Sequence, residues 1–230
     1  MTQAAMTQAT QTRWVILASS QPESDPGAVD KWLSAVSDLP NQSKHVLDAD
    51  AGRVLPGSVA EADVTADLRI DTGTVDGRPL DTIPEIAQVL DSACFSTVEP
   101  LALNVIAASR LDDAGPRVKR TLALTVRAGT PEVDIERFER SLAAMPEHIR
   151  EIRSWSLSRV DRARSSGPWT HVWEQEYADV DGVRVAYLQH PYHWTGVDRW
   201  FDPEMPCAIV EPRLAHIFRW VDQPIVASGQ

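Results

Sequence analysis

The chain has 230 residues, 43% of them apolar, and carries a formal net charge of −11. This length allows one domain or two small ones with substantial cores, and an acidic balance without a dense Lys/Arg patch argues against a nucleic-acid partner. The two cysteines, Cys94 and Cys207, lie far apart and favour neither a disulfide framework nor a zinc site. No apolar run approaches the roughly 20 residues of a membrane span, so we expect a cytoplasmic protein with no membrane partner.

The sequence contains two similar halves. When the chain is shifted on itself by about 106 to 112 residues, Leu39-Pro40 falls on Met145-Pro146, and Trp14-Val15-Ile16-Leu17 falls on Thr121-Leu122-Ala123-Leu124. The same order of elements is therefore expected in both halves.

The predicted elements of the first half follow a polar N-terminal segment. Residues 1–12 repeat themselves after five residues and are expected to form a disordered tail. The first half then covers residues 13–112. Its strands are predicted near 13–18, 44–54, 63–70 and 101–108, and its helices near 27–39 and 81–93.

The second half, residues 119–222, shows the same pattern more clearly. A short apolar strand at 122–126 precedes a helix whose apolar residues recur at steps of three and four and form one core-facing stripe. Strands are predicted at 155–160, 169–178 and 213–220, and a second helix at 183–190, ended by Pro191. This order is βαββαβ, followed by a tail at 223–230. The stripe consists of Ile135, Phe138, Leu142, Met145, Ile149 and Ile152.

The segment 187–194, Tyr-Leu-Gln-His-Pro-Tyr-His-Trp, concentrates chemically active side chains. An imidazole titrates near neutral pH and can take or give a proton, and a phenol can donate a hydrogen bond to a developing oxyanion. Tyr187 and His193 are therefore a candidate acid/base pair that needs no cofactor.

The second half resembles the stress-responsive dimeric α/β-barrel (Dabb) family over Lys119 to Val221. The residues that carry the resemblance are the first strand at 122–126, Thr170-His171-Val172, and above all Tyr187 with His190-Pro191-Tyr192-His193. In that family two ferredoxin-like subunits pair their sheets into a barrel. The resemblance, with the internal repeat, implies an α+β fold of tandem ferredoxin-like (βαββαβ) repeats that forms an intramolecular pseudo-dimeric α/β barrel.

The resemblance also implies roles for single residues. By similarity to the family's cyclase, Tyr187 and His193 are the catalytic pair, His171 lines the same pocket and His190 supports it. The cyclase has a histidine just before the first strand, where this chain has Arg120 and Thr121. The corresponding segment of the first half, 83–96, contains neither tyrosine nor histidine, so the first half is expected to be a scaffold.

Aromatic residues suggest the walls of the pocket. Strand alternation places His171, Trp173, Gln175 and Tyr177 on one face, which we interpret as a cavity wall, although a hydrogen-bonded core histidine is an alternative for His171. Segment 194–206 is a candidate lid or rim over the site, although its charges are expected to form a solvated face. Six of the eight tryptophans lie in the second half, which suits an aromatic ligand. The candidate substrate-binding residues are His171, Trp173, His190, Trp194, Tyr177 and Trp155.

Other site chemistries have weaker support. Three histidines (His171, His190 and His193) have poor spacing for a metal, and Glu174 and Glu176 on one strand are expected to be solvated rather than a glycosidase pair. The chain has no Gly-rich phosphate loop or dinucleotide fingerprint, so no cofactor is expected.

Three functions remain open. The first is a cofactor-independent lyase or cyclase acting on a small, aromatic or polyketide-like substrate through aldol-type cyclisation, retro-aldol cleavage or elimination. The second is a non-catalytic small-molecule-binding stress-response protein, and the third is a cofactor-free monooxygenase. Pairing of the fused barrel into a homodimer is also left open.

Overall fold

The computed structural model describes residues 11–60, 62–71, 78–110 and 115–226. Residues 1–10 of the expected N-terminal tail and 227–230 of the C-terminal tail lie outside the described residues. The start of the second tail is docked: the backbone N–H groups of Ile225 and Val226 both donate to Glu176 Oε1, at 2.7 and 2.8 Å.

The first half has the expected order of elements. Three of its helices have proline in the first turn, where the missing N–H removes no helical hydrogen bond. The elements are β1 (Gln11–Ser20), α1 (Pro26–Ser37), α2 (Leu39–Gln42), β2 (Val46–Arg53), β3 (Val64–Asp71), η1 (Leu80–Thr82), α4 (Pro84–Leu90) and β4 (Phe95–Ser109).

The second half repeats this order up to its last connection, which is longer and irregular. The elements are β5 (Arg117–Leu124), α5 (Glu132–Ala143), α6 (Met145–His148), β6 (Ser154–Val160), β7 (His171–Tyr177), η2 (Gly182–Tyr187), η3 (His193–Val197), η4 (Asp198–Trp200) and β8 (Ala215–Val221).

All eight strands form one antiparallel sheet in the order β2-β3-β1-β4-β6-β7-β5-β8. The halves join where β4 pairs with β6. The two outer strands meet on the other side, because the Val59 and His216 backbones pair just after β2 and within β8, and the Leu55 N–H donates to the Phe218 carbonyl at 2.7 Å. The sheet therefore curls into a nearly closed barrel, the pseudo-dimeric α+β barrel predicted from the repeat.

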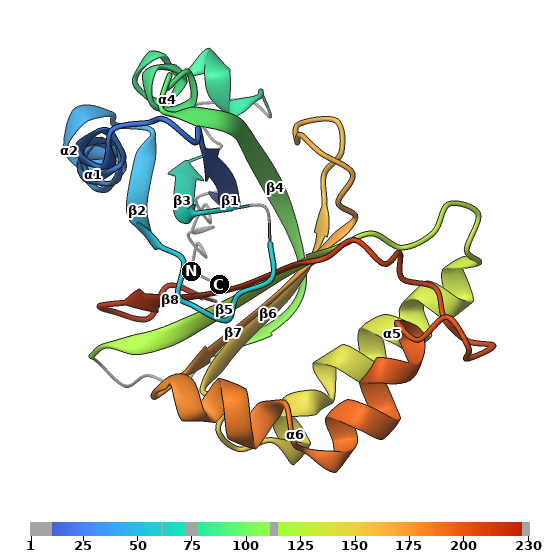
Figure 1. Ribbon diagram of the computed structural model, residues 1–230. Helices are drawn as coiled ribbons and strands as arrows, with labels where there is room; N and C mark the ends of the chain where they lie inside the picture. Colours follow the sequence, from blue (N-terminus) through green and yellow to red (C-terminus); the bar gives the residue numbers. More distant parts are fainter. Residues whose placement is uncertain (1–10, 61, 72–77, 111–114, 227–230) are drawn as a thin grey trace, which may run out of the picture.

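The helices lie outside the barrel (Figure 1). Helices α1, α2 and α4 cover one side, and α5 and α6 cover the opposite side. Each helical layer has its own apolar core: Trp14, Ile16 and Leu39 belong to the first, and Phe138 and Leu142 to the second. The predicted helical stripe of the second half is confirmed, since four of its six residues have no exposed surface.

Equivalent elements fix the repeat at 106 residues, because α1 and α5 begin at residues 26 and 132, and α2 and α6 at 39 and 145. With this spacing, Arg120 in the second half is the counterpart of Trp14 in the first half. The predicted match of Trp14 to Thr121 was wrong by one residue, and a shift of one residue turns every strand side chain to the other face. Trp14 faces the helices, whereas Ala123, two residues after Thr121, faces the barrel interior.

One end of the barrel interior is filled by ion pairs between the halves. Lys119 Nζ lies 2.5 Å from Asp67 Oδ1 and 2.8 Å from Glu174 Oε1, and Arg13 NH1 lies 2.8 Å from Glu174 Oε2. Arg219 bonds to Asp67 as well. The expectation that Glu174 is solvated was therefore wrong: its side chain is fully buried, and the cations opposite it make this burial tolerable.

Glu176, also expected to be solvated, lies within the same end of the barrel. It has no exposed side-chain surface, lies 3.3 Å from Arg117 and accepts hydrogen bonds from the backbone N–H groups of Ile225 and Val226.

Among the described residues, no helix is both long and apolar enough to cross a membrane.

Candidate active site

A pocket of about 320 Å³ opens between the outer face of the sheet and the irregular helical segment of the second half. Its walls are largely apolar and its polar groups converge from β5, η2, η3 and β8, an arrangement common to small-molecule sites. The lining residues are Val59, Arg120, Leu122, Leu142, Tyr187, Leu188, His193, Val197, Asp198, Phe201, Leu214 and His216.

Both predicted catalytic residues line this pocket. Tyr187 ends η2 and His193 begins η3, and both elements are π-helical, a wide form that occurs frequently at functional sites. The rings of Tyr187 and His193 meet edge to face with their centroids 4.6 Å apart.

The predicted helix at 183–190 differs from the observed one. Element η2 covers Gly182–Tyr187, and a turn at 188–189 follows it. Pro191 then starts a new helical turn, because a proline without an N–H fits the first turn of a helix. This break lets Tyr187 and His193 approach the same pocket from two segments.

Arg120 supplies a cation beside the pair. Its guanidinium carbon lies 4.6 Å from the centroid of the Tyr187 ring, its NH1 donates to Gln175 Oε1 at 2.8 Å, and its Nε donates to His216 Nε2 at 2.6 Å. Arg120 is 3% exposed, so this charge acts in a poorly solvated environment. These two acceptors are an imidazole nitrogen and an amide oxygen.

His193 is in its neutral form at neutral pH. Burial, followed by the positive charge of Arg120 and by His190, lowers the pKa of the His193 imidazole to about 4. Its Nδ1 lies 3.5 Å from Asp198 Oδ2, and within the described residues this nitrogen has no hydrogen-bond partner. Burial raises the pKa of the Asp198 carboxyl, and Arg120 opposes that rise.

Tyr187 is a neutral phenol. The residue is 1% exposed, and burial raises the pKa of its hydroxyl against the opposing effect of Arg120. A phenol with a raised pKa keeps its proton at neutral pH and can donate it in a hydrogen bond.

His216 is a site residue that the sequence analysis missed. Burial, and then Arg120, lowers the pKa of the His216 imidazole to about 2, so the ring is neutral and its Nε2 accepts from Arg120. In the sequence, His216 stands on a predicted strand with no motif around it. Only the pairing of that strand with β5 shows that His216 lies near Arg120. Asp198 was expected on a rim and does line the pocket, near His193.

The structure places His171 elsewhere. It is 3% exposed beneath α5, where Nε2 lies 3.1 Å from Glu139 Oε1 and Nδ1 lies 2.9 Å from Thr170 Oγ1. Both ring nitrogens thus have partners in the core, and His171 is not among the pocket-lining residues. His171 is therefore a hydrogen-bonded histidine of the core, which was the alternative interpretation of this residue in the sequence.

The other predicted substrate-binding residues are not among those that line the pocket. Trp173 and Tyr177 are fully buried, and Tyr177 lies behind Tyr187 with ring centroids 6.1 Å apart. Trp155 packs on Trp173, with centroids 5.4 Å apart. Trp194 is 55% exposed and donates from its indole to the Leu188 carbonyl. Trp155 and Trp173 lie on strands and pack on each other, whereas Trp194 lies in η3 at the surface.

His190 stabilises the break between the two helical segments. Its Nδ1 accepts a hydrogen bond from the Tyr192 N–H at 3.1 Å. This bond belongs to a turn, which agrees with a supporting position near His193.

In the first half, apolar side chains occupy the corresponding space. Trp14 lies at the position equivalent to that of Arg120. The layer above it is filled by apolar residues of η1, α4 and the link between them: Leu80, Ile83, Ile86 and Val89.

Among the described residues, no three His, Cys, Asp or Glu side chains converge as a metal site requires.

The barrel with one pocket beneath its helical layer defines the class of protein: a fused pseudo-dimer of ferredoxin-like units. The family model described as Stress responsive A/B Barrel Domain matches residues 118–210. The family model thus matches most of the second half of the chain, from the start of β5 to the residues before β8. A search of curated protein sequences finds no significant match.

Solved structures share the whole fold. An anthrone oxidase-like protein aligns with 8% identity and a TM-score of 0.62, covering 96% of this chain and 97% of its own. A proposed monooxygenase from Fusobacterium nucleatum aligns with 12% identity and a TM-score of 0.59, covering 96% of each chain. A proposed monooxygenase from Lactobacillus acidophilus aligns with 10% identity and a TM-score of 0.56, covering 96% and 97%. At these identities the likeness shows the fold alone.

Proposed function

We propose that the pocket is the active site of a cofactor-independent lyase or cyclase that acts on a small, oxygenated, aromatic or polyketide-like substrate. The observation that carries this proposal is the convergence of a neutral imidazole, a neutral phenol and a buried guanidinium on one mainly apolar pocket. Proton abstraction next to a carbonyl requires a base and a group that stabilises the oxyanion, and these side chains supply both.

His193 is the general base. With Nδ1 facing Asp198, Nε2 takes the proton from a carbon or hydroxyl of the substrate, and the bonding electrons move onto the substrate oxygen. The Asp198 carboxylate then stabilises the imidazolium, as a carboxylate next to a catalytic histidine does in hydrolases. A pKa of about 4 makes the free imidazole a weak base, so this stabilisation is an essential part of the proposal.

Tyr187 and Arg120 stabilise the resulting enolate or alkoxide. The phenol donates a hydrogen bond, and the guanidinium contributes a permanent positive charge in surroundings with little water. Collapse of that oxyanion forms a new carbon–carbon bond in a cyclisation, or breaks one in a retro-aldol cleavage. In either direction the proton returns from His193.

A turnover screen with matched variants tests this proposal. Small aromatic and polyketide-like compounds are first screened for thermal stabilisation, since a ligand at about 100 times its dissociation constant adds roughly 2.7 kcal/mol. Stabilising compounds are then incubated with the wild type, His193→Ala and Tyr187→Phe, and products are detected by mass spectrometry. We expect His193→Ala to lose most of the 10²- to 10⁴-fold contribution typical of a general base, and Tyr187→Phe to lose a smaller part. Full turnover by the His193 variant would exclude this assignment.

A cofactor-free monooxygenase is the second candidate, favoured by the proposed monooxygenases among the structures that share the whole fold. The same enolate could react with oxygen instead of a carbon electrophile. Oxygen consumption that depends on substrate distinguishes this reaction from a lyase or cyclase.

The third candidate, a non-catalytic binding protein, predicts equal binding of a ligand by all three proteins and no conversion by any of them. Formation of a homodimer stays a prediction that gel filtration with light scattering can test.

A further inference from the structure

The candidate active site contains a buried cation whose hydrogen-bond acceptors are neutral. Arg120 is 3% exposed and lines the pocket. Its Nε donates to the neutral His216 imidazole at 2.6 Å, and its NH1 donates to the Gln175 amide oxygen at 2.8 Å. Within the described part of the chain, no carboxylate accepts a hydrogen bond from this guanidinium. Its positive charge therefore has no bonded counter-ion in the protein.

The other buried cations of the described chain each lie beside a carboxylate, because burying a charge is costly unless it is paired. The pairs are Arg117 with Glu176 at 3.3 Å, Lys119 with Asp67 at 2.5 Å and Arg219 with Asp67 at 2.7 Å. Arg120 is the exception, and the fold does not require it, since the equivalent position of the first half holds Trp14 in an apolar core. A cation of this kind on the wall of a pocket favours an anionic ligand.

The acidic residue of the lining, Asp198, does not replace that counter-ion. It experiences the positive charge of Arg120, which opposes the rise in the pKa of its carboxyl caused by burial. Its side chain is nevertheless 47% exposed and lies 3.5 Å from Nδ1 of His193. Water screens a charge exposed to this extent, and the position of Asp198 pairs it with the imidazole. The charge of Arg120 thus remains available to a single anionic group.

The hydrogen bonds of Arg120 also select the form of that group. The one N–H of Nε goes to His216, and one N–H of NH1 goes to Gln175. The Nε edge of the guanidinium is therefore closed to a carboxylate, which binds best with two parallel hydrogen bonds. Tyr187 lies alongside, with its ring centroid 4.6 Å from the guanidinium carbon, and its hydroxyl is a further donor to the pocket. This arrangement suits one ionised oxygen better than a carboxylate.

We propose that the substrate is an acidic enol or phenol that binds with its oxygen ionised, held by Arg120 and the Tyr187 hydroxyl. This inference rests on the proposed function, because it takes the same pocket as the active site. The proton of the bound O–H goes to Nε2 of His193: the O–H bond breaks, an N–H bond forms and the electron pair stays on the oxygen. A 1,3-dicarbonyl compound or a phenol is acidic enough to give its proton to a weak base, whereas an isolated ketone is not.

The probe is 4-nitrophenol, because its ionised form absorbs visible light and its neutral form does not. At pH 6 the free compound is mostly neutral, and we expect the wild type to bind it as the coloured phenolate. Two control compounds are 4-nitroanisole, which cannot ionise, and 4-nitrobenzoate, which carries a carboxylate. Each should bind about tenfold more weakly in isothermal titration calorimetry, the effect of a hydrogen bond to a charged group. Binding of 4-nitrophenol in its neutral form, or equally tight binding of either control compound, would overturn the proposal.

Variants then locate the anion. Arg120→Gln should remove the phenolate absorption and weaken binding about tenfold, and Arg120→Lys, which keeps the charge, should retain part of both. Thermal unfolding checks that both variants fold. Phenolate absorption and affinity that stay unchanged in a folded Arg120→Gln variant would overturn the proposal.

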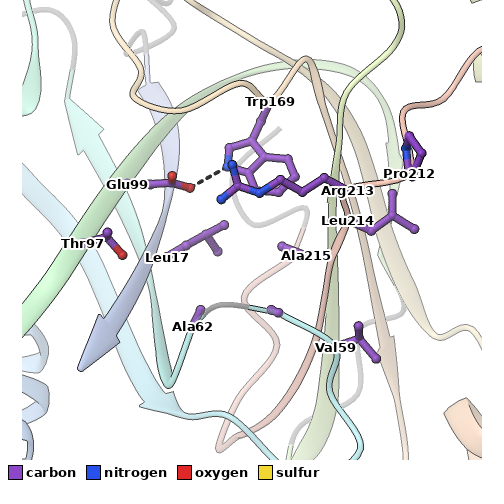
Figure 2. Close-up of a pocket in the computed structure, with 11 residues that line it drawn as sticks. Leu17, Val59, Ala62, Thr97, Glu99, Trp169, Pro212, Arg213, Leu214 and Ala215 are labelled. Carbon is purple, nitrogen blue, oxygen red and sulfur yellow. Dashed lines mark hydrogen bonds between the residues drawn. The ribbon is translucent and has the colours of Figure 1, made fainter. Parts of the chain in front are cut away.

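The matched control is an arginine of another pocket. A pocket of about 470 Å³ opens at one end of the barrel, and there the Arg213 side chain extends across the Trp169 indole, with its guanidinium carbon 5.4 Å from the ring centroid (Figure 2). Arg213 is exposed, so Arg213→Gln should fold normally and bind 4-nitrophenol like the wild type. Phenolate binding that is kept in Arg120→Gln and lost in Arg213→Gln would place the anion at the barrel end and overturn the proposal.

These binding results are independent of turnover, because 4-nitrophenol has no bond that a cyclisation or retro-aldol cleavage could form or break. If His193→Ala loses turnover while 4-nitrophenol and 4-nitroanisole bind alike, the proposed function stands and the substrate class is wrong. If the phenolate binds through Arg120 while His193→Ala keeps full turnover, the anion site stands and the assignment of the base is wrong.

Discussion

Arg120 on β5 and His216 on β8 lie diagonally across neighbouring strands, and the Nε of Arg120 donates to the Nε2 of His216 at 2.6 Å. Burial, and then the permanent cation next to it, lower the pKa of the His216 imidazole, and the neutral imidazole in turn accepts a hydrogen bond from Arg120. The pair fixes the guanidinium over the Tyr187 ring.

Arg120→Gln should reduce kcat by about 10²- to 10³-fold, the effect of removing one oxyanion donor, while substrate binding changes less. Arg120→Lys should retain part of the activity because it keeps the charge without the fork of donors. Steady-state kinetics on the converted substrate provides the measurement. The control is Arg140→Gln, whose side chain is largely exposed on α5 and should have wild-type kinetics. Equal loss in both variants would show that the effect is not specific to the site.

The pH dependence of turnover should reflect the lowered pKa of His193. The base is active when neutral, and its pKa lies at about 4, so kcat/KM should stay level from pH 8 down to about 5.5 and fall towards pH 4. An activity profile between pH 4 and pH 8 measures this directly. A loss of activity centred at pH 6.5 would mean that the imidazole titrates as it does in water, and that burial and Arg120 do not act on it.

Folding stability should also decrease on acidification. His193 and His216 have folded-state pKa values of about 4 and about 2, below the usual 6.5, so the unfolded chain binds protons that the folded chain does not. Their contribution to stability is complete above pH 6.5 and is lost as the pH falls through that value towards 4 and below. For His216 this loss is on the order of 1 kcal/mol per pH unit below 6.5. Urea unfolding at pH 7.5 and pH 5.5 measures it.

His216→Gln provides the matched variant, since an amide can still accept a hydrogen bond from Arg120 but does not titrate. The difference in unfolding free energy between the two pH values should be smaller in this variant than in the wild type. A difference of the same size would show that other groups cause the pH dependence.

Much of the fold could be predicted from the sequence because its evidence is local and repeated. The apolar spacing of α5 and the prolines at the starts of α2 and α6 recur in both halves, and the repeat itself implied the fused barrel. The register of β1 against β5 could not be fixed, because a shift of one residue keeps the apolar content of a strand and changes only which face each side chain occupies.

The candidate site was predictable where it lies in one segment. Tyr187 and His193 are six residues apart and share a motif, and both line the pocket. Arg120 was noticed only as a departure from the family, and His216 carries no local pattern. Trp173 and His171 have the composition of a ligand site but lie beneath α5, because a helix covers the strand face that alternation had assigned to a cavity.

Lys119→Met should destabilise the protein by about 3–5 kcal/mol, because it leaves the buried carboxylates Asp67 and Glu174 without one of their cations. These three residues join the halves inside the barrel, so the loss should appear as one cooperative decrease in the urea midpoint. The control is Arg53→Met, which removes the exposed pair with Asp30, at 2.7 Å, and should cost about 0–1 kcal/mol. The double variant Lys119→Met/Glu174→Gln should be less destabilised than the sum of its single variants, since the charge left unpaired by one change is removed by the other. Strict additivity would show that the ion pairs between the halves do not act as a unit.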